Sequence, residues 1–268
     1  MRRLGQHFLI NKRKIRGIVE ALELKDGDTV VEIGPGHGEL TKELRTQNLK
    51  CRIIAIEKDK GLAKSLTEKF SKDENIEIVE GDALKALSRL IQNPEFRIKN
   101  YKIVGNIPYY ITGYLFRILS ELGNKPSLII LMIQKEVAER ICALRQARGK
   151  PNMNLLAASV QFWAEPKIIG SVSKKNFRPM PKVDSAIIKL KPLITASGSS
   201  DKYYKFIKIL FKQPRKTILN NLASGAKGGK HQALKEEIIK KLKEIGISPQ
   251  SRPQNLNIKQ IAELSTLF

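Results

Sequence analysis

The chain has 268 residues, 41% hydrophobic and 28% charged, which is enough to bury a core in one large domain or two unequal ones. Its formal net charge of +23 favours a polyanionic partner, although a lysine-rich proteome would also explain it. The two cysteines lack a CxxC partner and the three histidines are scattered, which argues against disulfides and a metal site. Because no apolar run suits a signal peptide or a membrane span, we expect a cytoplasmic protein without a membrane partner.

The first elements alternate between helix and strand. Apolar residues at helical spacing predict a helix over 12–24, and a β-branched run predicts a strand over 29–33. This strand leads into a glycine loop, Gly34-Pro35-Gly36-His37-Gly38, after which a helix begins. Glycines permit positive φ and carry no Cβ that would keep a ligand from the backbone. Because Glu39 replaces the third glycine of a dinucleotide motif, a ligand without a pyrophosphate fits better than NAD.

The next strands also end on polar side chains. Glu57 follows a strand predicted over 52–56, and Asp82 follows one predicted over 76–79. In open α/β sheets, ligands bind outside the carboxyl ends of the strands. An acid about 20 residues after the first glycine suits ribose hydroxyls, so we prefer that role for Glu57 over a merely exposed charge. Asp82 would lie beside the same cleft and could accept a hydrogen bond from an adenine amino group.

A fourth strand, predicted over 101–104, delivers Asn106-Ile107-Pro108-Tyr109 at its end. The Asn106 side chain and the Ile107 carbonyl offer two acceptors, and proline fixes the turn between them and the ring. Tyr109 offers a flat face on which a base could stack. This arrangement suits the exocyclic amino group of a nucleobase. A chance turn is the alternative, since Asn and Pro favour turns for local reasons.

The rest of the chain completes one α/β unit and then becomes helical. Its βα alternation predicts a mostly parallel sheet covered on both faces, within a domain at 1–194. A small polar stretch at 195–201 reads as a linker, and a basic all-helical domain follows at 202–268, with 14 Lys and Arg but 4 Asp and Glu. The predicted helices are 114–122, 135–145, 155–163 (a helix or a buried run), 202–211, 215–222, 234–245 and 258–264; the predicted strands are 127–132, 166–172 and 186–190.

With these motifs assembled, the chain resembles the ribosomal RNA adenine dimethyltransferases, from Leu4 to its C-terminus. The motif at 4–9 and the segments at 134–140 and 179–186 are more specific to this family than the glycine loop, which most methyltransferases share. The motifs are Leu4-Gly5-Gln6-His7-Phe8-Leu9, Val31-Glu32-Ile33-Gly34-Pro35-Gly36, Gly81-Asp82-Ala83, Gly105-Asn106-Ile107-Pro108-Tyr109, Gln134-Lys135-Glu136-Val137-Ala138-Glu139-Arg140 and Pro179-Met180-Pro181-Lys182-Val183-Asp184-Ser185-Ala186.

The resemblance implies a Rossmann-like fold that uses S-adenosyl-L-methionine, and dimethylation of N6 on two adjacent adenines near the 3′ end of small-subunit rRNA in an assembling ribosomal subunit. A monomer is expected. It implies that Asn106, Ile107, Tyr109 and Phe177 act on the target adenine, with the two rings on either side of the base. It also implies a cofactor site formed by His7, Leu9, Gly34, Glu57, Asp82 and Asn106.

The sequence departs from the family at several positions. Relatives often carry Asn at position 7, where His can still donate or accept a hydrogen bond. The usual arginine pair appears as Gln213-Pro214-Arg215-Lys216, where Pro214 suits a helix start. The loop at 149–154 lacks the usual Tyr-Gly, and only Arg2 and Arg3 form the basic arm. Two rival functions are the large-subunit rRNA methyltransferase of macrolide resistance and a non-catalytic assembly or transcription factor.

Overall fold

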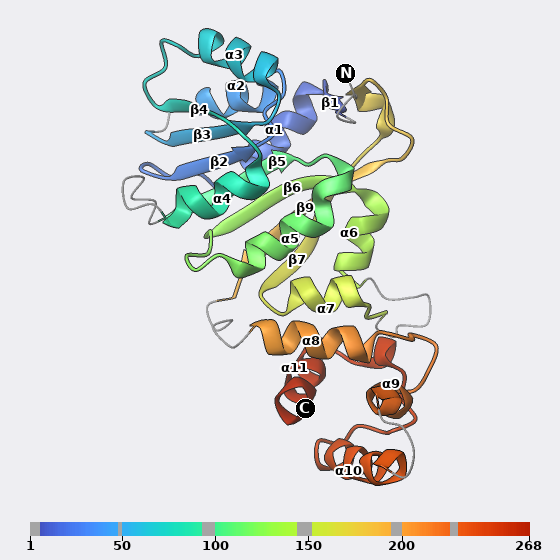
Figure 1. The fold of residues 1–268 in the computed structure, drawn as a ribbon. Coiled ribbons are helices and arrows are strands. Elements are labelled where there is room, and N and C mark those ends of the chain that lie inside the picture. Colours follow the sequence, from blue (N-terminus) through green and yellow to red (C-terminus); the bar gives the residue numbers. More distant parts are fainter. Residues whose placement is uncertain (1–5, 48–49, 93–99, 144–151, 194–199, 226–229) are drawn as a thin grey trace. The chain divides into compact units, whose positions relative to one another are not determined.

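The computed structural model describes residues 6–47, 50–92, 100–143, 152–193, 200–225 and 230–268 (Figure 1). The N-terminal arginines, most of the predicted 195–201 linker and residues 149–151 of the loop at 149–154 lie outside these ranges. The chain divides into two compact units, one of Met1–Ala138 with Ala164–Pro192, and one of Glu139–Trp163 with Leu193–Phe268. The second unit therefore includes a segment from within the predicted first domain.

The first unit is built on a seven-stranded sheet in the order β4-β3-β2-β5-β6-β9-β7. Strands β4 to β6 pair in parallel, whereas β9 pairs antiparallel with both β6 and β7, so the predicted mostly parallel sheet is confirmed. The strands are β2 (Thr29–Ile33), β3 (Arg52–Glu57), β4 (Ile76–Glu80), β5 (Tyr101–Asn106), β6 (Leu128–Gln134), β7 (Ala164–Val172) and β9 (Ser185–Pro192).

Helices cover both faces of this sheet. The helices are α1 (Lys12–Glu20), α2 (Glu39–Arg45), α3 (Lys60–Lys69), α4 (Ala83–Gln92) and α5 (Thr112–Glu121), whereas α6 (Lys135–Ile141) follows β6 and spans the boundary between the two units. Helices α4 and α5 contact each other on the face turned toward the viewer in Figure 1, and α1 contacts α2. Apolar residues of α1, such as Ile15 and Ile18, pack on alternate strand residues, including Val30, Ile53 and Val104. Alternation along the strands therefore buries both faces.

A two-stranded antiparallel ribbon joins the start of the chain to its middle. Strand β1 (Phe8–Leu9) pairs with β8 (Phe177–Arg178), and the register sets Phe8 opposite Arg178 and Leu9 opposite Phe177. A short 3₁₀ helix, η3 (Lys174–Asn176), precedes β8. The ribbon was not predicted, because each strand has only two residues.

The second unit is helical around a separate apolar core. Its helices are α7 (Leu155–Gln161), α8 (Ser200–Leu210), α9 (Ile218–Leu222), α10 (Lys230–Glu244) and α11 (Ile258–Leu267), with short 3₁₀ turns η4 (Ala223–Gly225) and η5 (Pro253–Asn255). Tyr203 and Phe206 of α8 are buried in this core, and the Tyr203 ring stacks on Phe162 at 3.7 Å between centroids. The unit thus has a core of its own, as a compact domain requires.

The predicted helix start at 215 was wrong. Helix α9 begins at Ile218, and the side chain of Thr217 accepts a hydrogen bond from the Asn220 amide as its N-cap. The buried Asn221 side chain accepts from the Gln213 amide and donates to the Gln213 and Thr217 carbonyls. These bonds hold 213–217 as a turn that places Arg215 before the helix.

Candidate active site

The glycine loop lies at the carboxyl end of β2, where the sheet order turns from β3 on one side to β5 on the other. Gly34 and Gly36 both have positive φ, at 67° and 59°. A Cβ on Gly36 would also lie 2.7 Å from the ring of Phe8, so a larger residue would displace the N-terminal ribbon. The loop therefore brings bare backbone to the sheet's switch point, which is where open α/β sheets bind ligands.

Glu57, at the end of β3, is held by the loop backbone. Glu57 is only 3% exposed, and its Oε2 accepts a hydrogen bond from the Gly36 amide at 3.0 Å. Its Oε1 accepts from the Asp59 amide at 2.9 Å. Each carboxylate oxygen has a second acceptor site, so both can still accept from ligand hydroxyls. The two amides fix the direction of this carboxylate before any ligand binds.

Asp82, just beyond β4, is held by a different set of donors. Its Oδ1 accepts from the Leu84 amide at 3.0 Å, and its Oδ2 accepts from Lys58 Nζ at 2.8 Å. Burial alone would raise the pKa of Asp82, but the hydrogen bonds from Lys58 and Leu84 and the charge of Lys58 bring it below its ordinary value. The carboxylate is therefore ionised at neutral pH and can act as an acceptor.

Asn106, at the end of β5, has a defined orientation. Its Nδ2 donates to the His7 carbonyl at 2.7 Å, so the side-chain oxygen is the group left to accept from a ligand. The His7 ring in turn bonds the Pro179 carbonyl through Nδ1 at 2.8 Å. Gly105 allows β5 to lie close to β2, because a Cβ there would be 2.6 Å from the Ile33 carbonyl.

The two rings expected to hold a base differ in position. Tyr109 belongs to the 3₁₀ turn η2 (Tyr109–Ile111), and its hydroxyl is 2.9 Å from Ser185 Oγ. Its ring centroid is 5.9 Å from that of His7. Phe177 is instead 1% exposed and packs in the core beneath α1. The structure thus presents one aromatic face at the site and keeps the second ring inside.

Most of these residues line one open cavity, whose empty volume is about 790 Å³ when its solvent-open part is included. Leu9 borders a second, smaller hollow that shares Gly34 and Asn106. Phe177 borders neither hollow. Of the residues expected at the site, the cavity is lined by His7, Gly34, Glu57, Asp82, Asn106, Ile107 and Tyr109.

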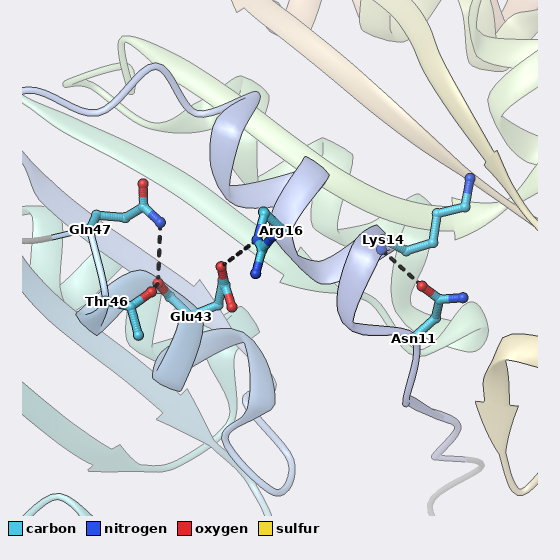
Figure 2. Close-up of polar contacts among 6 residues, drawn as sticks. All are labelled: Asn11, Lys14, Arg16, Glu43, Thr46 and Gln47. Atoms are coloured by element: carbon cyan, nitrogen blue, oxygen red, sulfur yellow. Dashed lines mark hydrogen bonds and ion pairs between the residues drawn. The ribbon is translucent and has the colours of Figure 1, made fainter.

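The ribbon and α1 hold the N-terminal segment against this cavity. Asn11 Nδ2 donates to Asn176 Oδ1 at 2.7 Å, and the Ile10 amide donates to the Asn176 carbonyl. Figure 2 shows Asn11 as the N-cap of α1, with its Oδ1 accepting from the Lys14 amide. The same view shows the exposed pair of Arg16 with Glu43 on α2, which contributes at most about 1 kcal/mol. These bonds fix the carboxyl-terminal end of the segment that carries His7 and Leu9.

A buried carboxyl lies beneath the loop. Glu32 of β2 is 1% exposed, and its Oε2 accepts from the Thr41 hydroxyl at 2.7 Å. Burial raises the pKa of Glu32 to about 7, the Thr41 bond opposes that rise, and the charge of Glu57 adds to it. The bond joins β2 to α2 across the glycine loop.

Sequence reasoning did not assign roles to Lys58 and Tyr110, which also line the cavity. Lys58 directly follows Glu57, and Tyr110 directly follows Tyr109. Their position next to predicted site residues was the sequence signal that could have indicated them. In the part of the chain that the structure describes, no cluster of His, Cys, Asp and Glu could hold a metal ion, and no helix is long and apolar enough to cross a membrane.

Comparison with solved structures defines the class of protein. The crystal structure of a dimethyladenosine transferase from Plasmodium falciparum matches with a TM-score of 0.78 and 26% identity, covering 96% of each chain. That of the 23S rRNA methyltransferase ErmE matches with a TM-score of 0.71 and 26% identity, covering 97% of this chain and 98% of ErmE. The fold is that of the Rossmann-like methyltransferases, as predicted.

Sequence comparison narrows this class to one family. The profile of the ribosomal RNA adenine dimethylases matches residues 1–262. The ribosomal RNA small subunit methyltransferase A of Dehalococcoides mccartyi strain 195 is 37% identical over 99% of this chain and 87% of its own length. That of Moorella thermoacetica is 35% identical over 97% of this chain and 90% of its own. The chain belongs to the ribosomal RNA adenine dimethylase family, whose methyltransferase fold implies use of S-adenosylmethionine.

Proposed function

We propose that this protein dimethylates N6 of two adjacent adenines near the 3′ end of small-subunit rRNA, with S-adenosyl-L-methionine as methyl donor. The observation that carries the proposal is the orientation of Asn106, which lines the cavity and donates through Nδ2 to the His7 carbonyl, so that its side-chain oxygen is the group left to accept. The relatives named ribosomal RNA small subunit methyltransferase A support the choice of subunit.

The lining of the cavity supports this methyl donor. Gly34 and Gly36 bring backbone without a Cβ to it, and the fixed Glu57 carboxylate could accept from ribose hydroxyls. Asp82 lines the same cavity and could accept from an amino group. His7, Leu9, Gly34, Glu57, Asp82 and Asn106 would hold the donor, which supplies a methyl group already activated by a positive sulfonium.

The residues beside the target base would make its amino nitrogen more nucleophilic by orienting it through hydrogen bonds. The nitrogen's lone pair is delocalised into the purine ring. If Asn106 Oδ1 and the Ile107 carbonyl accept its two N–H bonds, the nitrogen moves toward tetrahedral geometry and its lone pair becomes available. Ile107 is buried, and its amide donates to the Met132 carbonyl at 3.0 Å, which holds the Asn106–Ile107 peptide just before this carbonyl. Orientation by fixed groups is a large source of rate acceleration.

The base must leave its stack to reach this site, and Tyr109 and Phe177 would hold it. Tyr109 is anchored through Ser185, whereas Phe177 would have to leave its buried position or admit the base beside it. The net charge of +23 would attract RNA phosphates without regard to sequence. We further propose that the substrate is rRNA within an assembling subunit, that the enzyme acts in the cytoplasm as a monomer, and that 1–194 and 202–268 are its catalytic and helical domains.

The decisive experiment incubates the protein with radiolabelled S-adenosylmethionine and either immature small subunits or unmodified large-subunit rRNA. We expect label only in the small subunit, recovered as N6,N6-dimethyladenosine. Label in the large subunit would move the protein to the resistance branch, to which the likeness to ErmE also points. Cofactor binding without label on either RNA would favour a non-catalytic assembly factor.

A further inference from the structure

Two tyrosines at the edge of the cavity are turned toward solvent. Tyr110 is 62% exposed and Tyr114 is 58% exposed, more than any other large hydrophobic side chain in the described ranges. Neither hydroxyl has a hydrogen-bond partner among the described residues. Tyr109, the residue before them, is by contrast bound to Ser185. The exposed rings therefore offer their faces to a ligand rather than to the core.

The two rings flank the junction between two consecutive helices. Tyr110 lies in η2, and Tyr114 lies four residues later in the first turn of α5, which begins at Thr112. Both rings are exposed, and Tyr110 also lines the cavity. The rings can therefore offer two stacking faces that start at the mouth of the cavity.

Gly113 leaves the surface beside these rings without a projecting side chain. It is exposed, its φ is not positive, and a Cβ placed on it would meet no heavy atom within 4 Å. Neither backbone geometry nor packing therefore requires glycine here. The bare backbone leaves room for a flat ligand beside the two rings.

The platform is continuous with the proposed active site. Tyr110 lines the same cavity as Asn106 and Asp82. Lys58 lines this cavity as well, where its ammonium bonds Asp82 and stays half-exposed. An exposed ring and a cation at one cavity are the groups that bind single-stranded nucleic acid, through base stacking and phosphate attraction.

We propose that Tyr110 and Tyr114 form a stacking platform for the nucleotide next to the adenine being methylated. This inference rests on the proposed function, in which two adjacent adenines are modified in turn. When one adenine leaves the stack, its neighbour loses a stacking partner, and an exposed tyrosine face replaces it. The platform would hold the second adenine next to the site of Asn106 until the first adenine is dimethylated and leaves that site.

The test compares Tyr110→Ala/Tyr114→Ala with Tyr110→Phe/Tyr114→Phe, which keeps both rings. Immature small subunits are the substrate, and the product is resolved into subunits with one or two dimethyladenosines. Stacking is worth about 1–3 kcal/mol per base, so we expect the alanine variant to raise KM for subunits by about ten-fold or more. It should also accumulate singly modified subunits, whereas the phenylalanine variant should behave as the wild type does.

Two further variants separate stacking from general surface effects. Gly113→Leu adds a side chain beside the two rings and should raise KM as the alanine variant does. Ile169→Ala removes an exposed apolar side chain from β7 of the same unit and serves as the control. Affinity for S-adenosylmethionine, measured by calorimetry, should be the same in all variants.

Specific results would overturn the platform. Unchanged KM and product distribution in the alanine variant would overturn it, and so would a loss of cofactor affinity as large as the loss of methylation, because Tyr110 would then be a wall of the cofactor site. Absence of label with the wild-type protein would overturn the proposed function itself. Wild-type labelling with an unaffected alanine variant would overturn the platform alone.

Discussion

The two sides of the cavity are held by different kinds of contact. On the proposed cofactor side, Glu57 is fixed by two backbone amides and Asp82 by an amide and Lys58. On the proposed base side, Tyr109 is fixed by one hydroxyl bond, and Phe177 is buried. In the proposed function, the cofactor side is therefore formed in advance, whereas the base side would be completed when RNA binds. Preorganised groups add most to affinity and rate because no ordering is required when the ligand arrives.

Asn106 belongs to both sides, so Asn106→Ala should have the largest effect. It removes the acceptor for the adenine amino group and the bond to the His7 carbonyl. We expect the single-turnover rate of methylation to fall by about 10²–10³-fold, as when a fixed transition-state contact is lost elsewhere. Cofactor affinity should fall by about ten-fold or less, since one neutral hydrogen bond is worth roughly 0.5–1.5 kcal/mol.

The matched control is Asn124→Ala, at an exposed position whose backbone carbonyl accepts from Tyr101 and is unchanged by the substitution. It should leave the rate and the cofactor affinity as they are. Near-normal methylation by Asn106→Ala would remove the central element of the proposed mechanism.

Glu32 tests the stability of the cofactor side. The pKa of Glu32 is about 7 in the folded chain against 4.5 for the free side chain, because burial disfavours its charge. Between these values the folded state holds a proton that the unfolded state has released, so the free energy of unfolding falls as pH rises from about 4.5 to about 7. Above pH 7 the loss amounts to about 3 kcal/mol.

Glu32→Gln should abolish this dependence, because the amide keeps an acceptor for Thr41 but does not ionise. Denaturation at pH 5 and pH 8 measures it. The variant should gain stability relative to the wild type at pH 8 and little at pH 5. An equal difference between the two proteins at both pH values would show that Glu32 is ionised in the folded chain throughout this range.

Glu57→Ala should weaken the cofactor side without affecting chemistry. It removes a charged acceptor and leaves the Gly36 and Asp59 amides without their partner. A hydrogen bond to a charged group is worth about 1.5–3 kcal/mol, so we expect Kd for S-adenosylmethionine to rise by about 30-fold. The rate at saturating cofactor should change little. Glu80→Ala, at the exposed end of β4, is the control, and a fall in rate without a change in Kd would contradict the assignment.

The cofactor side could be predicted from the sequence better than the base side. Gly34, Glu57 and Asp82 follow β-branched runs, and parallel strands bring their carboxyl ends to one edge, so local pattern sufficed. The ribbon could not be predicted, because Leu9 and Phe177 are distant in sequence and lie in strands of two residues. Helix α4 was missed although Ala83 and Leu87 are buried at helical spacing, a signal that was present in the sequence.

Phe177→Leu tests whether the base side is completed on binding. Leucine keeps an apolar side chain in the core, so the free energy of unfolding should fall by about 1.5 kcal/mol or less. Loss of the ring should lower kcat/KM for small subunits by about ten-fold, with cofactor affinity unchanged. Phe116→Leu removes a buried ring from α5 and should reproduce the stability loss alone. If both variants lowered kcat/KM equally, Phe177 would act through the core, and Tyr109 alone would hold the base.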